Sequence, residues 1–174
     1  MRSGVFAILA AACLAAQSAG LWLDVPFVRQ GKDGCGSAVL AMTMQYWFHH
    51  GASGSAAEAD AVQIQNQLYS PAERGILASA LAGYLERHGF RTVAFRGAWP
   101  DLSEQLAKGR PLIVCLRSGS DSRHYVVVAG VNGETVEVND PADRKLRKLD
   151  RAAFEKKWRA AGNWTLLAVP RALS

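Results

Sequence analysis

The chain has 174 residues, of which 49% are hydrophobic and 20% are charged, and its net charge is +5. A chain of this length can form one domain with a substantial core but is short for two. The apolar content excludes a chain that is disordered throughout, and the sequence shows no internal repeat. We therefore expect one globular domain with an ordinary core.

The first twenty residues differ in composition from the rest of the chain. Arg2 is followed by an apolar run over residues 5–16 and then by small residues up to Gly20. This order is typical of a secretory signal peptide, and the apolar run is shorter than a membrane span. We expect residues 1–19 to be a signal peptide and the mature protein to be exported, periplasmic or secreted, with no membrane span. Two alternatives remain for this segment: a lipid attached to Cys13, or a buried N-terminal helix.

Apolar residues recur at helical spacing in the next part of the chain. The segment 35–48 is apolar almost all round, which is typical of a helix buried in the middle of a domain. The segment 75–88 is amphipathic and ends at His88-Gly89, a pair typical of a helix C-terminus. The helices expected in this part cover residues 35–48, 56–68, 75–88 and 102–107.

The pattern changes to strands in the later part of the chain. Residues 111–116 form a continuous apolar run, and Asn132-Gly133 between two further apolar segments is a strong hairpin signal. The expected strands cover residues 92–95, 111–116, 125–131, 135–138 and 163–169, with one more helix over 151–160. Helices that precede strands indicate the α+β class with an antiparallel sheet.

Cys35 is the first candidate for chemistry, because it begins the buried helix directly after Asp33-Gly34. The free N–H groups and the dipole at a helix N-terminus favour a negative charge, so a thiol there is more readily ionised to the reactive thiolate. Gly34 and Gly36 on either side allow a substrate backbone to approach closely. The alternative is a buried structural cysteine.

His124 is the candidate base, since it begins an expected strand next to a polar loop. His49, His50 and His88 lie at the ends of expected helices, where hydrogen bonding to a terminal carbonyl explains them. His124 is therefore the histidine we assign to chemistry.

Asp140 is the candidate partner of His124, and the register of the hairpin decides whether the two meet. If Gly133 is the left-handed last residue of a three-residue loop, His124 lies directly opposite Asp140. With a two-residue turn, His124 faces Pro141 instead. The alternation of apolar residues after the turn favours the first register, in which the carboxylate orients the imidazole. The alternative for Asp140 is a plain turn residue before Pro141.

Gln30 lies five residues before Cys35 and supplies a side-chain amide. Together with the backbone N–H of Cys35, this amide could form an oxyanion hole, in which one donor typically lowers a barrier by about 3 kcal/mol. The histidines and acidic residues show no metal-ligand spacing, so we expect no metal and no organic cofactor.

The order Gln30, Cys35, His124, Asp140 resembles the C39 peptidase family, papain-like cysteine peptidases known from bacteriocin-exporting transporters. The resemblance is carried by residues 24–27, Gln30, 35–42, 77–89, 109–114, 124–130 and 138–142, with Phe154 and Trp158 in the helix that follows. It implies a papain-like α+β domain over residues 21–174, in which N-terminal helices, one of them the buried catalytic helix, pack on a C-terminal antiparallel sheet.

The resemblance also implies the role of each site residue. Cys35 would be the nucleophile, His124 the base, Asp140 the orienting acid and Gln30 the oxyanion-hole donor. Transporter-fused members cut leader peptides after a Gly-Gly pair. This chain has no P-loop and carries Ser37 where many relatives have Pro, so we expect a peptide or protein substrate and leave the cleavage preference open.

Two other functions remain compatible with the sequence. One is an amidase or acyl transferase that uses the same residues. The other is a non-enzymatic envelope binding module in which Cys35 and Cys115 form a disulfide, although the apolar strand around Cys115 favours a buried free thiol. The basic cluster over residues 144–159 is interspersed with acids and is interpreted as a solvated surface, with attraction to an anionic envelope surface or an acidic substrate as the alternative. Because we expect the protein to be exported, we expect no nucleic-acid partner. The sequence defines no oligomeric state.

Overall fold

The computed structural model describes residues 20–118 and 122–172. The proposed signal peptide over residues 1–19, Cys13 included, lies outside the described residues. The helices are α1 (Cys35–His49), α2 (Ala61–Leu68), α3 (Ala78–Arg87), α4 (Trp99–Ala107) and α5 (Arg151–Ala160). The strands are β1 (Leu21–Trp22), β2 (Phe90–Arg96), β3 (Leu112–Ser118), β4 (Ser122–Asn132), β5 (Thr135–Asn139), β6 (Arg147–Asp150) and β7 (Trp164–Pro170). No helix in the described part of the chain is long and apolar enough to cross a membrane.

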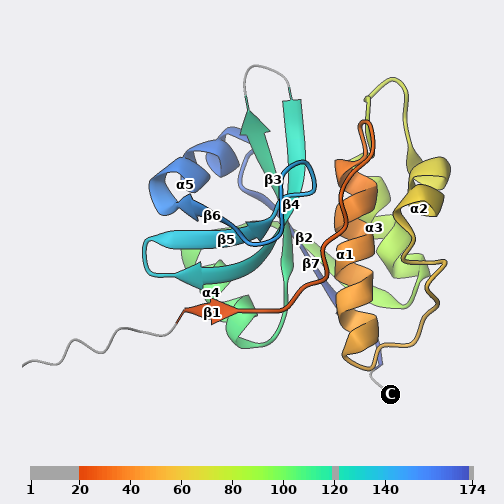
Figure 1. Ribbon diagram of the computed structural model, residues 1–174, viewed down its shortest axis with the longest axis horizontal. Helices are drawn as coiled ribbons and strands as arrows, with labels where there is room; N and C mark the ends of the chain where they lie inside the picture. Colours follow the sequence, from red (N-terminus) through yellow and green to blue (C-terminus); the bar gives the residue numbers. More distant parts are fainter. Residues whose placement is uncertain (1–19, 119–121, 173–174) are drawn as a thin grey trace, which may run out of the picture.

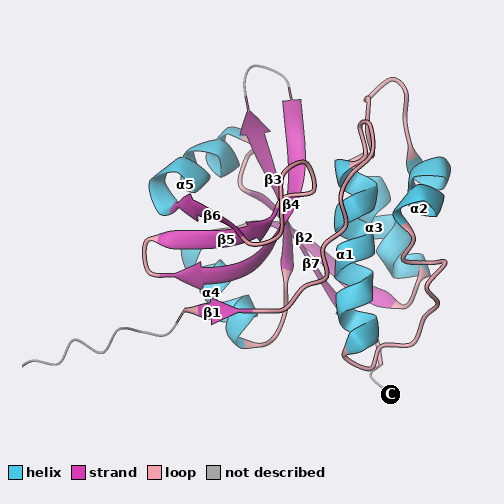
Figure 2. Cartoon of the chain, in the orientation of Figure 1, coloured by secondary structure: helices cyan, strands magenta, loops and turns pink. Residues whose placement is uncertain are grey.

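All the strands join one antiparallel sheet, in the order β2-β7-β3-β4-β5-β6 (Figure 2). The short β1 pairs with the end of β4 that extends beyond the reach of β3. Because the helices α1 to α3 precede most of the strands and the strands run antiparallel, the predicted α+β class is confirmed.

Helices cover both faces of the sheet, so the domain has two apolar cores (Figure 1). Helices α1, α2 and α3 pack on one face, where α1 is buried along most of its length. Helices α4 and α5 pack on the other face, anchored by the fully buried Phe154 and Trp158. Strands β3 and β4 are therefore buried on both sides, which explains their continuous apolar sequence.

Two helices begin later than the sequence predicts. Residues 70–75 close a turn in which Ser70 N and Gly75 N each bond the other residue's carbonyl, at 2.9 and 3.3 Å, so α3 begins at Ala78 instead of 75. Helix α2 begins at Ala61 because Asp60 caps its first turn. Strand β6 was not predicted, because its alternating exposed charges resemble a loop.

The predicted register of the β4–β5 hairpin is wrong. Asn132 lies opposite Thr135, so the connection is a two-residue turn and not a three-residue loop. Gly133 does adopt a left-handed conformation, with φ at +52°, but as the first of the two turn residues. His124 and Asp140 are therefore not directly opposite each other in the ladder.

A β-bulge at Ala129 reduces the difference, because it shifts the register of β4 against β5 by one residue toward the predicted one. The carbonyl of Ala129 accepts a hydrogen bond from Leu23 N at 2.7 Å, so the segment that follows β1 satisfies this carbonyl. Strand β5 ends at Asn139. Asp140 is consequently the first residue of the following turn and reaches His124 from the end of the strand.

Candidate active site

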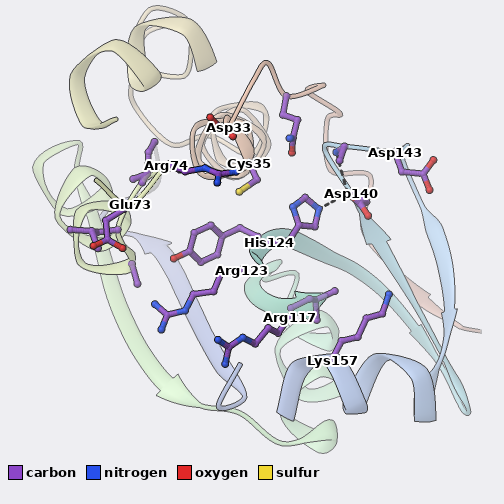
Figure 3. A pocket seen from close by; sticks show the side chains of 18 of the residues that line it. Asp33, Cys35, Glu73, Arg74, Arg117, Arg123, His124, Asp140, Asp143 and Lys157 are labelled. Atoms are coloured by element: carbon purple, nitrogen blue, oxygen red, sulfur yellow. Dashed lines mark hydrogen bonds and ion pairs between the residues drawn. The ribbon is translucent and has the colours of Figure 1, made fainter. Parts of the chain in front are cut away.

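Cys35 is the first residue of α1, and its thiol is half-buried in a cleft between the N-terminus of this helix and the sheet (Figure 3). The chain enters the helix through a tight turn, with Gly34 N bonded to Gly31 O at 3.2 Å and Asp33 in a left-handed conformation (φ +54°). The Oγ of Ser37 donates to Gly34 O at 3.0 Å and fixes the first turn. The thiol therefore lies where the helix directs its free N–H groups.

His124 and Asp140 form a close pair beside this thiol. The Nε2 atom of His124 lies 2.6 Å from Asp140 Oδ1, and the side chains are 24% and 7% exposed. Because Nε2 is bound to the carboxylate, Nδ1 is the ring nitrogen left for Cys35. Burial of the ring opposes its protonation, but hydrogen bonds to Asp140 and Cys35 and their charges raise the pKa of His124 from 6.5 to about 9. The thiol of Cys35 and the bonded pair of His124 and Asp140 thus line the same cleft.

Asp140 is held by more than His124. Its Oδ1 also accepts a bond from Ala142 N at 3.1 Å, and its Oδ2 accepts one from Arg147 Nη1 at 2.8 Å. Burial favours the neutral acid, but these donors and the His124 charge outweigh it and lower the pKa of Asp140 from 3.8 to about 2. Arg147 lies on the unpredicted strand β6 and also contacts Asp143 at 3.3 Å. The carboxylate is therefore ionised and fixed in place.

Gln30 lines the same cleft as Cys35. Its backbone N–H donates to Pro141 O at 3.0 Å, which joins the segment before α1 to the turn that carries Asp140. Its side-chain Oε1 is buried and has no hydrogen-bond partner in the described structure. This oxygen is an acceptor, whereas an oxyanion hole needs a donor, so the oxyanion-hole role of Gln30 stays a prediction.

Asn139 fixes the segment that leads to Gln30 and was not singled out from the sequence. Its fully buried amide donates to Val25 O at 3.0 Å and to Pro26 O at 3.3 Å, and its Oδ1 accepts from Leu146 N at 2.9 Å. The bonded residues lie up to 114 positions apart in the chain. No local pattern could have revealed this contact.

The cleft that contains these groups has a volume of about 1010 Å³, and loops and strands on both sides of Cys35 line it. One wall is the turn before α3, with Glu73 and Arg74. The buried Tyr125, which packs edge-on against Trp164, forms part of the lining. Further charged residues line the rest of the cleft: Asp33, Arg117, Arg123, Asp143 and Lys157. A groove of this size suits a peptide-sized ligand.

Cys115 lies on β3, opposite Tyr125 in the ladder, and its thiol is buried. Burial raises the pKa of Cys115 from 9.0 to about 11. Both Cys35 and Cys115 are free thiols, so the disulfide of the alternative reading is not present.

The other histidines behave as helix-end residues. The Nδ1 atoms of His50 and His88 bond the carbonyls of Tyr46 and Tyr84, at 2.7 and 2.8 Å, as the sequence predicted for helix C-termini. Within residues 20–118 and 122–172, no group of three or more His, Cys, Asp or Glu side chains is arranged to hold a metal ion.

Comparison with known proteins identifies the family of this chain. The model of the Peptidase C39-like family matches residues 22–166. The chain belongs to this family. It is therefore a cysteine peptidase by class, and the predicted resemblance to the C39 peptidases is confirmed.

Relatives of this C39-like peptidase share its fold. The lactococcin-G-processing and transport ATP-binding protein LagD of Lactococcus lactis subsp. lactis is 29% identical over 133 residues, which are 75% of this chain but 17% of LagD. A protein described as a C39-like peptidase of Bacillus anthracis has a TM-score of 0.70 at 19% identity and covers 88% of this chain and 99% of its own. A double-glycine-motif protease from an AMS/PCAT transporter, solved with a leader peptide, has a TM-score of 0.62 at 20% identity and covers 86% and 94%.

Proposed function

We propose that this C39-like peptidase hydrolyses peptide bonds with Cys35 as the nucleophile, His124 as the general base and acid, and Asp140 as the group that orients His124. The observation that carries the proposal is that one cleft is lined by Cys35, at the start of α1, and by His124 and Asp140, which are bonded to each other at 2.6 Å. A nucleophile, a base within hydrogen-bonding reach and a third group that orients the base are the requirements for acyl transfer through a covalent intermediate.

The first step is attack of the Cys35 sulfur on the substrate carbonyl. The proton of the thiol passes to Nδ1 of His124, and the resulting imidazolium is stabilised by the buried carboxylate of Asp140. Arg147 keeps that carboxylate ionised and positioned. The helix N-terminus favours the thiolate that the proton transfer produces.

The tetrahedral intermediate places a negative oxygen close to the start of α1. We assign its stabilisation to the backbone N–H of Cys35 and to the side-chain amide of Gln30. The position of Gln30 in the lining of the cleft that contains Cys35 supports the assignment. His124 then protonates the leaving amine, and water, deprotonated by His124, releases the acyl group from the Cys35 sulfur.

The substrate that we propose is a peptide or an extended protein segment. LagD is named for processing lactococcin G, and the AMS/PCAT protease was solved with a leader peptide, so relatives of this chain act on or bind peptides. This chain spans 17% of the length of LagD, so the whole transporter's activity is not transferred to it. We further propose that residues 1–19 direct export, so that the enzyme meets peptides outside the cytoplasm.

The test is a digest of a diverse peptide library by the protein and by its Cys35→Ala variant. We expect cleavage by the wild type and none by Cys35→Ala, since the nucleophile is lost. Cys115→Ala is the matched control, because that thiol is buried away from solvent, and it should retain cleavage. The proposal would be contradicted if the wild type and Cys35→Ala cleaved equally, or if neither protein cleaved any peptide in reducing buffer. Products joined to an added amine instead of water would indicate a transferase.

A further inference from the structure

One of the buried tyrosines differs from the others in its hydroxyl group. Three tyrosines of the described chain are buried: Tyr46, Tyr84 and Tyr125, at 3%, 1% and 6% exposed. The hydroxyl of Tyr46 donates to Gly109 O at 2.8 Å. The hydroxyl of Tyr84 donates to Glu58 O, also at 2.8 Å. A buried tyrosine hydroxyl usually has such a partner, but the hydroxyl of Tyr125 makes no hydrogen bond to any residue that the structure describes.

The ring of Tyr125 is held by the sheet and by the core under α1. Tyr125 lies opposite Cys115 in the β3–β4 ladder and belongs to the apolar core on the α1 face. Its ring packs edge-on against Trp164, with the two ring centroids 5.5 Å apart. Because a ring packed in this way cannot turn freely, the fold sets the direction of the hydroxyl.

The hydroxyl of Tyr125 is directed toward the cleft. Tyr125 lines the cleft together with Cys35, Glu73 and Arg123. The charges of these three residues act on the hydroxyl, so it lies at the end of the ring nearest to them. Figure 3 shows Glu73 and Arg123 on the opposite side of Cys35 from Asp140. The hydroxyl therefore meets a bound molecule on the side of the thiol away from that carboxylate.

The surroundings of the hydroxyl favour a neutral acceptor. Burial, with the charges of Cys115 and Cys35, raises the pKa of Tyr125 above its ordinary value, so the hydroxyl keeps its proton and can donate it to a hydrogen bond. The nearby charges of Glu73 and Arg123 have opposite signs and favour neither an anion nor a cation. The neutral acceptor that a peptide offers at every residue is its main-chain carbonyl, the same group that the other two buried tyrosines bind.

We propose that Tyr125 is a substrate-binding residue whose hydroxyl donates a hydrogen bond to a main-chain carbonyl of the peptide close to the scissile bond. A bond of this kind holds the backbone of a peptide of any sequence, so it positions the peptide and does not select a side chain. The proposal rests on the proposed function for the identity of the substrate, but the bond forms on binding and does not require turnover.

The experiment removes the hydroxyl and the carbonyl separately and together. A library peptide that binds Cys35→Ala is selected by isothermal titration, and each of its main-chain amides is replaced in turn by an alkene isostere, which lacks the carbonyl oxygen. Affinities are measured for Cys35→Ala with and without Tyr125→Phe. We expect one replacement to weaken binding to Cys35→Ala by about three- to ten-fold, the range of one neutral hydrogen bond. The same replacement should have no further effect when Tyr125→Phe is present.

Two further measurements separate substrate binding from a structural role. Tyr125→Phe removes a hydroxyl without a partner among the described residues, so the free energy of unfolding should not fall. Tyr84→Phe is the matched control: it should lower the free energy of unfolding, because Glu58 O loses its donor, and it should leave the effect of every isostere unchanged. With the active enzyme, Tyr125→Phe should raise KM by about three- to ten-fold for cleaved peptides of unrelated sequence.

Three results would overturn the proposal. The first is that every isostere weakens binding equally with and without Tyr125→Phe, and the second is that no library peptide binds Cys35→Ala. The third is that Tyr125→Phe is destabilised as much as Tyr84→Phe, since the hydroxyl would then have a partner within the protein. Failure of the proposed function has a different signature: the hydroxyl and one peptide carbonyl still depend on each other in binding, but the wild type cleaves no peptide.

Discussion

At the scale of single residues, the site depends on how firmly His124 holds its proton. The folded protein raises the pKa of His124 from 6.5 to about 9 and lowers that of Asp140 from 3.8 to about 2. Both shifts include the bond between His124 and Asp140, while Cys35 adds to the first shift and Ala142 and Arg147 add to the second. The charged pair is therefore a property of the fold, and both the stability and the activity of the protein should change with its titration.

The pH dependence has a defined sign. The contribution of protonated His124 is complete below pH 6.5 and is lost as the pH rises through 9. The contribution of ionised Asp140 is complete above pH 3.8 and is lost as the pH falls through 2. The wild type should therefore have a higher free energy of unfolding than Asp140→Asn. This difference should be largest between pH 3.8 and 6.5 and should be smaller at pH 9. Urea unfolding across this range measures it.

The same substitution should shift the activity profile. Without the carboxylate, His124 loses its proton at lower pH, so the alkaline fall of kcat/KM should move below pH 9 and the maximum should drop by about 100-fold or more. Asp143→Asn removes the other acid that binds Arg147 without touching His124, and the position of the alkaline limb should stay in place. An alkaline limb unmoved in Asp140→Asn would contradict the assigned pairing.

At the scale of elements, α1 presents Cys35 because its first turn packs tightly against the segment before α3. A Cβ atom added at Gly36 would lie 2.8 Å from the Cβ of Ile76, closer than real contacts allow. Ile76 also lines the cleft, so any movement there changes the wall beside the thiol. The glycine after Cys35 is thus required by packing, in addition to any approach of substrate.

We predict that Gly36→Ala lowers the free energy of unfolding by about 1–3 kcal/mol and reduces cleavage, since Ile76 must move. Gly83→Ala on α3 is the matched control. Its Cβ would meet only the flexible end of Arg87 at 3.3 Å, and alanine favours a helix by about 1 kcal/mol over glycine. Chemical unfolding of both variants checks the pair of expectations. Equal stability of the two variants would show that the contact with Ile76 is not limiting.

The sequence predicted elements better than it predicted contacts. Helix α1 and the hairpin could be located because their apolar periodicity and turn residues are local signals. The meeting of His124 with Asp140 was expected for the wrong reason, since the bulge at Ala129 has no sequence signal and the register differs. Long-range partners such as Asn139 with the segment before α1 could not be predicted, because packing of distant segments sets them.

At the scale of the whole molecule, the cleft forms where the helical layer meets the ends of the central strands. Cys35 comes from the helical layer and His124 from the sheet, so neither core alone holds the site. Asn139 and the bond from Gln30 N to Pro141 O tie the segment before α1 to the sheet. The relative position of the two layers therefore sets the distance between thiol and imidazole.

The central claim is that Cys35, His124 and Asp140 act as one unit on a peptide carbonyl. The most direct measurement is mass spectrometry of enzyme quenched in acid during turnover of a cleaved peptide. The account predicts a thioester adduct, equal in mass to the N-terminal product less water, that maps to Cys35, persists in Cys115→Ala and is absent in Cys35→Ala. An adduct that maps to Cys115 would contradict the account. So would cleavage by the wild type without an adduct at any thiol, together with undiminished cleavage by Cys35→Ala.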